Sequence, residues 1–177
     1  MDAYVRSFSP VWKTPSRDEA VRILVETRQV TDALVADLEP RQLDEIRGLG
    51  GGSWSIKDLL GHLATWEERG LFFAGVREHP GTAEPSTTDD FNRFHVERKS
   101  AWSPEEVVAD SETVRAALIA AISDMPDERW REKIQTRTGK SALGLVLGNV
   151  LAGAKYGLFA HDLAHYRDLK AAVTAER

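Results

Sequence analysis

The sequence predicts an all-α protein built as a four-helix bundle. Apolar residues recur at helical spacing in four long segments, and no strand-period alternation persists anywhere in the chain. The chain has 177 residues, which suits one domain, so we expect residues 1–177 to form a single four-helix-bundle domain. The connection over residues 79–103 is long enough for a crossover, so simple up-down-up-down order is not required.

The first three long helices have recognisable starts. In each, a serine is followed three residues later by an acidic residue, which is the spacing of a capping box. A proline or a His-Pro-Gly sequence then marks the end of each helix. The expected starts and ends are Ser16 (with Glu19) to Pro40, Ser53 or Ser55 (with Asp58) to His79, and Ser103 (with Pro104 and Glu106) to Pro126.

The remaining segments are shorter or less regular. The glycines at 50–52 predict a flexible turn, and a short helix is expected from Thr88 to about Lys99. Residues 127–140 are polar and mixed, which suits a loop or a short extended piece. We expect the fourth helix to run without a break from near Ser141 to about Ala172.

Composition excludes several classes of protein. The chain carries 28 acidic and 23 basic residues and no visible basic stripe, so a nucleic-acid partner is not expected. No apolar stretch approaches the length of about 18 residues that a membrane span needs, and no signal peptide is expected, so we expect a cytoplasmic protein. There is no cysteine, so any thiol chemistry would need a sulfur from a cofactor or substrate.

Two histidines one helical turn apart are the sharpest feature of the sequence. His161 and His165 can place both imidazoles on one face of a helix, where they can bind one ion. On a continuous helix they would extend the apolar stripe that begins at Leu143, and would therefore point into the bundle. His62 lies on the apolar face of the second helix. Ordinary core histidines bonded to backbone carbonyls would explain the same pattern.

The sequence also gives expectations for the other two histidines and for two acidic residues. His79 and His95 are expected at the surface, because each lies at a helix end or on a polar segment. Metal-bound histidines usually donate their second N–H to a carboxylate, a carbonyl or water. Asp58 and Asp168 are candidates for that role by spacing, although an acid at such a position is more often an ordinary residue on a helix surface.

The sequence resembles the DinB/YfiT-like metalloprotein superfamily over roughly residues 16–170. The resemblance rests on Trp54–Leu63, which reads WSIKDLLGHL, and on the late pair His161 and His165. Residues 90–92, followed by residues 103–107, resemble one branch of that group. The resemblance implies a four-helix bundle in which His62, His161 and His165 hold a divalent metal. Zinc is the first choice, and nickel or iron are alternatives.

The resemblance also implies chemistry with a low-molecular-weight thiol, since members include S-transferases and isomerases that use bacillithiol, mycothiol or glutathione. We therefore expect a metal-dependent S-transferase acting on a small-molecule substrate. A hydrolase using metal-bound hydroxide and a non-catalytic, sequestering bundle are the alternatives. Tyr166-Arg167-Asp168 follows the last histidine, where relatives often carry an amide such as glutamine, so substrate identity is open. No catalytic residue is assigned.

Two residues are expected to bind a substrate or thiol cofactor. Trp66 and Arg69 lie one and two turns beyond His62 on the second helix. Trp66 could form an apolar wall, and Arg69 could meet a carboxylate. Plain core packing for Trp66 and an ordinary ion pair for Arg69 are the simpler explanations.

A homodimer is also expected. The chain has more apolar residues than one small core obviously needs, and twofold dimers are the commonest oligomers. These residues are Val11, Trp12, Phe72, Val146 and Phe159.

Overall fold

The structure is a computed structural model that describes residues 2–78 and 87–176. The predicted helix starts are confirmed in it. Helix α2 (Arg17–Val35) follows Ser16, α4 (Ile56–Ala74) follows Ser55, and α6 (Pro104–Ser123) follows Ser103. Each of these serines accepts a hydrogen bond from the backbone three residues later, which satisfies a donor that the first turn leaves open. The short helix α5 (Thr88–Lys99) also matches its prediction.

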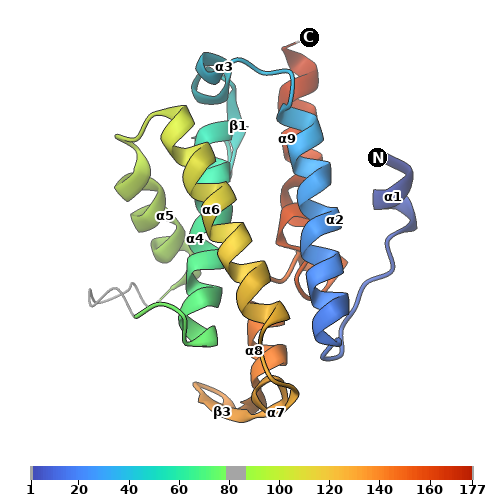
Figure 1. The fold of residues 1–177 in the computed structure, drawn as a ribbon. Helices are drawn as coiled ribbons and strands as arrows, with labels where there is room; N and C mark the ends of the chain where they lie inside the picture. The colour runs from blue at the N-terminus through green and yellow to red at the C-terminus, as the bar shows by residue number, and fades with distance from the viewer. Residues whose placement is uncertain (1, 79–86, 177) are drawn as a thin grey trace.

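The long helices lie side by side as a bundle (Figure 1), so the predicted fold class is confirmed. Helix α4 packs along α6, while α2 packs along the last helix, α9 (His161–Ala175), and also contacts α6. Helices α4 and α9 make much less contact with each other. The apolar core fills the space between these helices. Fully buried side chains come from several elements, including Ile23, Leu71, Leu118, Leu147 and Leu163.

Short helices and two small hairpins connect the long helices. Helix α1 (Asp2–Ser7) precedes α2, α3 (Pro40–Glu45) follows it, and α7 (Asp127–Arg131) follows α6. Strands β1 (Arg47–Leu49) and β2 (Trp54–Ser55) pair antiparallel around the predicted glycine turn. Strands β3 (Lys133–Thr136) and β4 (Gly139–Ala142) form the second hairpin, so the extended alternative predicted for residues 127–140 is correct there. The sequence did not predict the pairing of either hairpin.

The fourth helix is not continuous, so this prediction was wrong. Helix α8 (Leu143–Val150) ends early, a 3₁₀ turn, η1 (Ala154–Tyr156), follows, and α9 begins only at His161. The amide of Gly153 donates to the Gly157 carbonyl, and the Phe159 amide donates to Gly148. Phe159 itself has a positive φ of 61°. These contacts close a tight reversal that seats α9 beside α2 rather than in line with α8.

The surplus of apolar residues was also misjudged. Phe159 is fully buried and Val146 is nearly so, and they belong to the core. Phe159 packs against Trp130, with 6.0 Å between the ring centroids, and its amide bonds Gly148 in the turn between α8 and α9, a turn that helical periodicity does not predict. Trp12 is 58% exposed, and the homodimer stays a prediction. Within the described residues, every helix is too short or too polar to cross a membrane.

The reversal should tolerate no side chain at Gly153. A Cβ at this position would lie 1.8 Å from the carbonyl oxygen of Ala160, a backbone atom that cannot easily move. We expect Gly153→Ala to lower the free energy of unfolding by about 1–3 kcal/mol or more. Urea unfolding measures this loss. Gly61→Ala is the control: its Cβ would make ordinary contact with Lys99 at 3.4 Å, and stability should be unchanged or slightly higher. Equal effects from the two substitutions would contradict this account of the turn.

Candidate metal centre

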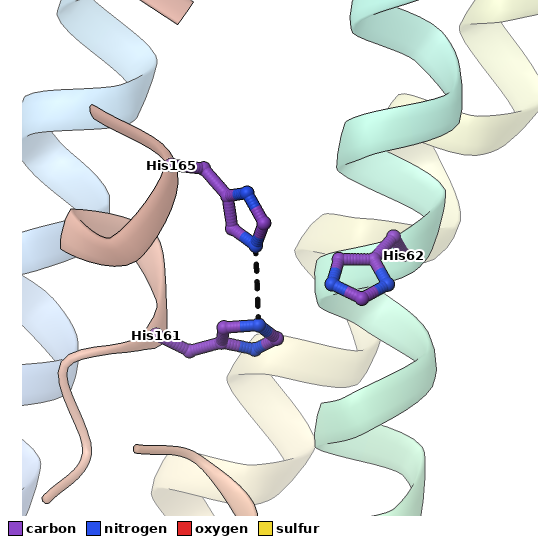
Figure 2. A group of neighbouring side chains, drawn as sticks. All are labelled: His62, His161 and His165. Carbon is purple, nitrogen blue, oxygen red and sulfur yellow. Dashed lines mark hydrogen bonds between the residues drawn. The ribbon is translucent and has the colours of Figure 1, made fainter. Parts of the chain in front are cut away.

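Three histidines from two helices face one another. The capping box at Ser55 starts α4 so that His62 lies on its buried face, and α9 begins with His161 and continues to His165 one turn later. Figure 2 shows the His62 ring directed at the other two. The ring centroid of His62 lies 5.0 Å from that of His161 and 5.1 Å from that of His165. The structure thus brings together the three predicted metal ligands, which we call the histidine cluster.

The environment of the histidine cluster keeps its rings neutral. His62 is only 4% exposed, and burial followed by the two neighbouring imidazoles lowers its pKa well below the ordinary value. Burial and His165 lower the pKa of His161 to about 3, and burial also lowers the pKa of His165. His161 is the first residue of α9, where the positive end of the helix dipole further disfavours a charged ring. Neutral imidazoles have the free lone pairs that a metal requires.

The donor set fits a divalent metal. One nitrogen from each ring of the histidine cluster lies within 4.8 Å of the others, and the two Nε2 atoms of His161 and His165 are 3.3 Å apart. Nitrogens bound tetrahedrally to zinc at about 2.0–2.1 Å would be about 3.3 Å apart. Within the described chain, Nδ1 of His161 is buried without a hydrogen-bond partner. The histidine cluster could therefore hold a metal ion, with coordination positions left for another ligand.

Aromatic side chains border the histidine cluster. The Trp54 ring lies 4.8 Å from His62, and Trp66 lies 6.4 Å from His62 and 6.1 Å from His161. Trp66 also packs on Phe91 and donates from Nε1 to the Asn92 side chain. These contacts hold Trp66 in one orientation beside the histidine cluster, and Trp66 also packs against the apolar core. Its role in binding a ligand stays a prediction.

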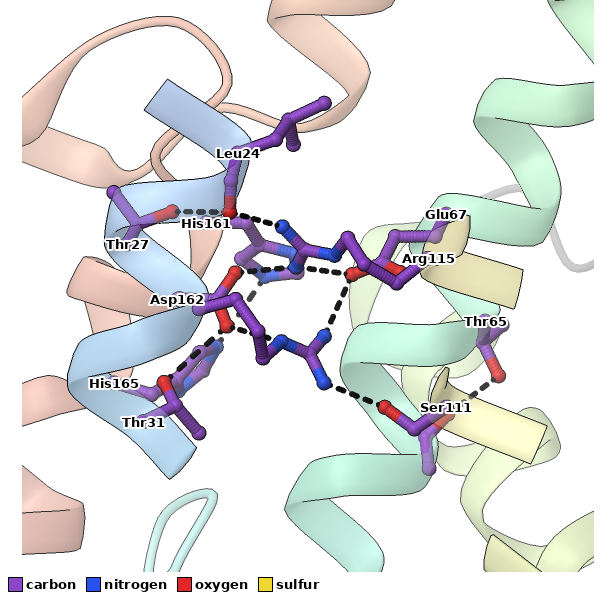
Figure 3. A network of polar contacts seen from close by, with 12 residues as sticks. Leu24, Thr27, Thr31, Thr65, Glu67, Ser111, Arg115, His161, Asp162 and His165 are labelled. Carbon is purple, nitrogen blue, oxygen red and sulfur yellow. Dashed lines mark hydrogen bonds and ion pairs between the residues drawn. The ribbon is translucent and has the colours of Figure 1, made fainter. Parts of the chain in front are cut away.

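A buried group of four charges lies directly behind the histidines. It consists of Arg28 on α2, Glu67 on α4, Arg115 on α6 and Asp162 on α9, and we call it the charge cluster. Arg28 contacts Glu67 and Asp162 at 2.9 Å each. Arg115 contacts Asp162 at 2.6 Å and also bonds Glu67 (Figure 3). Each arginine thus bridges the same two carboxylates.

Further hydrogen bonds anchor the charge cluster to the helices. Arg28 donates to Ser111 at 2.7 Å, Arg115 donates to the Leu24 carbonyl at 2.8 Å, and Thr31 donates to Asp162 at 3.2 Å. Burial alone would raise the pKa of Asp162, but Arg115 and Arg28 hold that pKa below its usual range. Because Asp162 is the residue after His161, the charge cluster fixes the start of α9 and with it the direction of the His161 ring.

Several expectations about neighbouring polar residues need correction. The Asp58 carboxylate accepts the backbone N–H of Ser55, so it caps α4 and does not orient an imidazole. Burial lowers the pKa of His165, and Asp162 and Asp168 only partly offset that lowering; no hydrogen bond joins Asp168 to His165 among the described residues. His95 is only 5% exposed and packs 4.3 Å from Phe91, so the prediction that it lies at the surface was wrong. The surface prediction for His79 concerns a residue outside the described ones.

The charge cluster was not predicted from the sequence. Its members lie within otherwise apolar stripes, where an isolated charge is costly unless it is paired. Arg28 follows Thr27 on the buried face of α2, and Glu67 follows Trp66 on α4. Arg115 directly follows the buried Val114 on α6. Opposite charges on inward faces of different helices are the signal that could have revealed it. Which of these charged residues pair depends on which helices are neighbours in the bundle, and the apolar periodicity of the sequence does not give that arrangement.

The charge cluster gives a prediction about stability. Arg115→Met would leave two buried carboxylates with one arginine, so the free energy of unfolding should fall by about 3–5 kcal/mol. Denaturant unfolding measures this loss of unfolding free energy. Arg22→Met is the matched control, because Arg22 pairs with Glu26 at 2.7 Å but is half exposed. Its loss should be at most about 1 kcal/mol. A similar loss of unfolding free energy in both variants would mean that the buried charge cluster stabilises the fold no more than an exposed ion pair does.

The histidine cluster gives a prediction about pH. Unfolded histidines take up protons below about pH 6.5, whereas the folded rings resist protonation until lower pH, about 3 for His161. The unfolded state therefore binds more protons in this window, and the stability of the metal-free protein should fall as pH drops from 7.5 to 5.5. Urea unfolding after chelator treatment measures the decrease. His161→Gln should show a smaller decrease, and an identical decrease would count against the neutral, buried assignment.

Solved structures with the same fold support this architecture. An uncharacterised protein from Escherichia coli UTI89 superposes with a TM-score of 0.71 at 14% identity, covering 91% of this chain and 94% of that one. A mycothiol-dependent maleylpyruvate isomerase superposes with a TM-score of 0.62 at 15% identity; 88% of this chain covers 61% of the isomerase. An uncharacterised protein from Clostridium difficile 630 gives a TM-score of 0.64 at 10% identity, covering 94% of this chain and 96% of that one.

At these identities the likeness concerns the fold alone. No curated protein matches the sequence. The family profile of the DinB superfamily matches residues 23–167, a range that includes all three members of the histidine cluster. The chain therefore belongs to the DinB superfamily.

Proposed function

We propose that the chain is a metal-dependent S-transferase that joins a low-molecular-weight thiol to an electrophilic small molecule. The observation that carries the proposal is the convergence of three neutral imidazoles within 4.8 Å. The chain has no cysteine, so the nucleophilic sulfur would come from the thiol. A divalent ion, with zinc as the first choice, would lower the pKa of the thiol and hold it as a thiolate at neutral pH.

The residues of the chain would supply position and exclude water. The histidine cluster would hold the ion from one side, with α4 and α9 fixed relative to each other by the charge cluster. Trp54 and Trp66 cover His62, which limits the access of water to the rings. Mycothiol is a reasonable thiol to test because it is named for one structural relative. Bacillithiol and glutathione share the same sulfur chemistry.

The assay pairs an aryl chloride, chlorodinitrobenzene, with each thiol. In the expected reaction a sulfur–carbon bond forms, the carbon–chlorine bond breaks, and chloride and one proton are released. Turnover should require both thiol and metal, and should return when chelator-treated protein is reloaded with zinc. Absorbance of the thioether measures the rate.

A parallel assay separates the hydrolase alternative. A nitrophenyl ester without thiol would be cleaved by a metal-dependent hydrolase, and release of nitrophenolate measures it. Ester cleavage that needs metal but no thiol would replace the transferase proposal with hydrolysis. Stoichiometric metal without turnover in either assay would favour a binding protein instead.

A further inference from the structure

A cavity of about 510 Å³ lies between α4, α5, the β3–β4 hairpin and α8. Pockets for small organic molecules typically have volumes of about 300–1,000 Å³. Trp66 lines this cavity and is also a neighbour of His62 and His161, at 6.4 and 6.1 Å between ring centroids. One aromatic side chain is thus in contact with both the cavity and the candidate metal centre. A ligand in the cavity would therefore contact Trp66, a neighbour of two members of the histidine cluster.

The charge of this cavity differs from that of the chain. Two of the described residues that line it, Arg69 and Arg137, are cationic, and none of them is acidic. The chain as a whole has a net charge of −5. A neighbouring cavity on the other side of Arg69 combines arginines with Glu68 and Asp110. The cavity beside Trp66 is therefore the one whose described lining favours an anion.

Arg137 is presented by a tight hairpin. Thr136 pairs with Gly139 across the turn, and the Thr136 hydroxyl donates to the Gly139 carbonyl at 2.6 Å. The Arg137 side chain is exposed and makes no ion pair with any residue that the structure describes. A guanidinium is a planar fork that pairs well with a carboxylate. The hairpin thus holds a guanidinium at the edge of the cavity that no acidic residue of the described chain pairs with.

The opposite wall is aromatic. The Cζ atom of Arg69 lies 4.8 Å from the centre of the Phe91 ring and 5.7 Å from that of Trp66, within the range of cation–π contacts. Phe73 and Val150 extend the apolar lining. An anion with a flat, apolar body would match the positive charge and the rings of this lining together.

We propose that this cavity binds a small aromatic carboxylate, with its carboxylate recognised by Arg137 and Arg69 and its ring against Trp66 and Phe91. The inference rests on the proposed function for the statement that such a ligand is a substrate. Binding itself requires only the cavity. The sequence predicts ligand binding by Trp66 and Arg69, whereas the role of Arg137 follows from its place on the β3–β4 hairpin.

Titration calorimetry of the full-length protein with benzoate and benzamide tests the proposal. These two probes have the same shape and differ in charge. We expect benzoate to bind at least tenfold more tightly than benzamide, and Arg137→Gln to weaken benzoate binding about tenfold with little effect on benzamide. Arg41→Gln is the control, because it changes net charge equally at a side chain on α3 that is 81% exposed. It should leave both affinities unchanged.

Several results would overturn the proposal: no benzoate binding, equal binding of the two probes, or unchanged benzoate affinity in Arg137→Gln. Inorganic phosphate that binds as tightly as benzoate would show that the aromatic rings contribute nothing. The titration is repeated after chelator treatment. Benzoate binding that disappears with the metal would place the anion on the ion and overturn the inference. Retained benzoate binding in a protein without thiol transfer would refute only the proposed function.

Discussion

The arrangement of the whole molecule depends on the charge cluster. Arg28, Glu67, Arg115 and Asp162 come from the four long helices of the bundle, one from each, and each arginine contacts both carboxylates. Apolar side chains would allow helices to slide or rotate at small cost, whereas a buried charge separated from its partner is expensive. The charge cluster therefore selects one register among the helices. Because Asp162 adjoins His161, that register is transmitted directly to the candidate metal centre.

The reversal between α8 and α9 supplies the second constraint. Gly153 allows the backbone to approach Ala160, and Phe159 adopts a positive φ beneath Gly148. Together these features let α9 begin at His161, so the first turn of this helix faces α4 across a region where the two helices make little contact. The imidazoles occupy that region. Strain at Phe159 and close packing at Gly153 thus accompany the placement of two of the three candidate ligands.

Local signals in the sequence were sufficient for the starts of the first three long helices, and the one-turn spacing of His161 and His165 indicated a possible metal site. Ser55 and Ser103 form capping boxes that depend only on neighbours three residues away. The inward direction of His161 was correct, yet the argument for it assumed a continuous helix that the chain does not form.

The reversal depends on contacts between Gly148 and the distant Phe159, and the charge cluster depends on which helices are neighbours. The burial of His95 likewise depends on how α5 packs. Such contacts are set by the tertiary fold, which periodicity and spacing do not encode.

X-ray absorption spectroscopy tests the central claim most directly: that the histidine cluster binds one divalent ion. The sample is full-length protein purified without a nickel column and analysed for total metal. The account predicts one ion per chain with three imidazole nitrogens as ligands, at about 2.0–2.1 Å if the ion is zinc. Fewer than three imidazoles per ion, or a spectrum dominated by carboxylate oxygens, would contradict it.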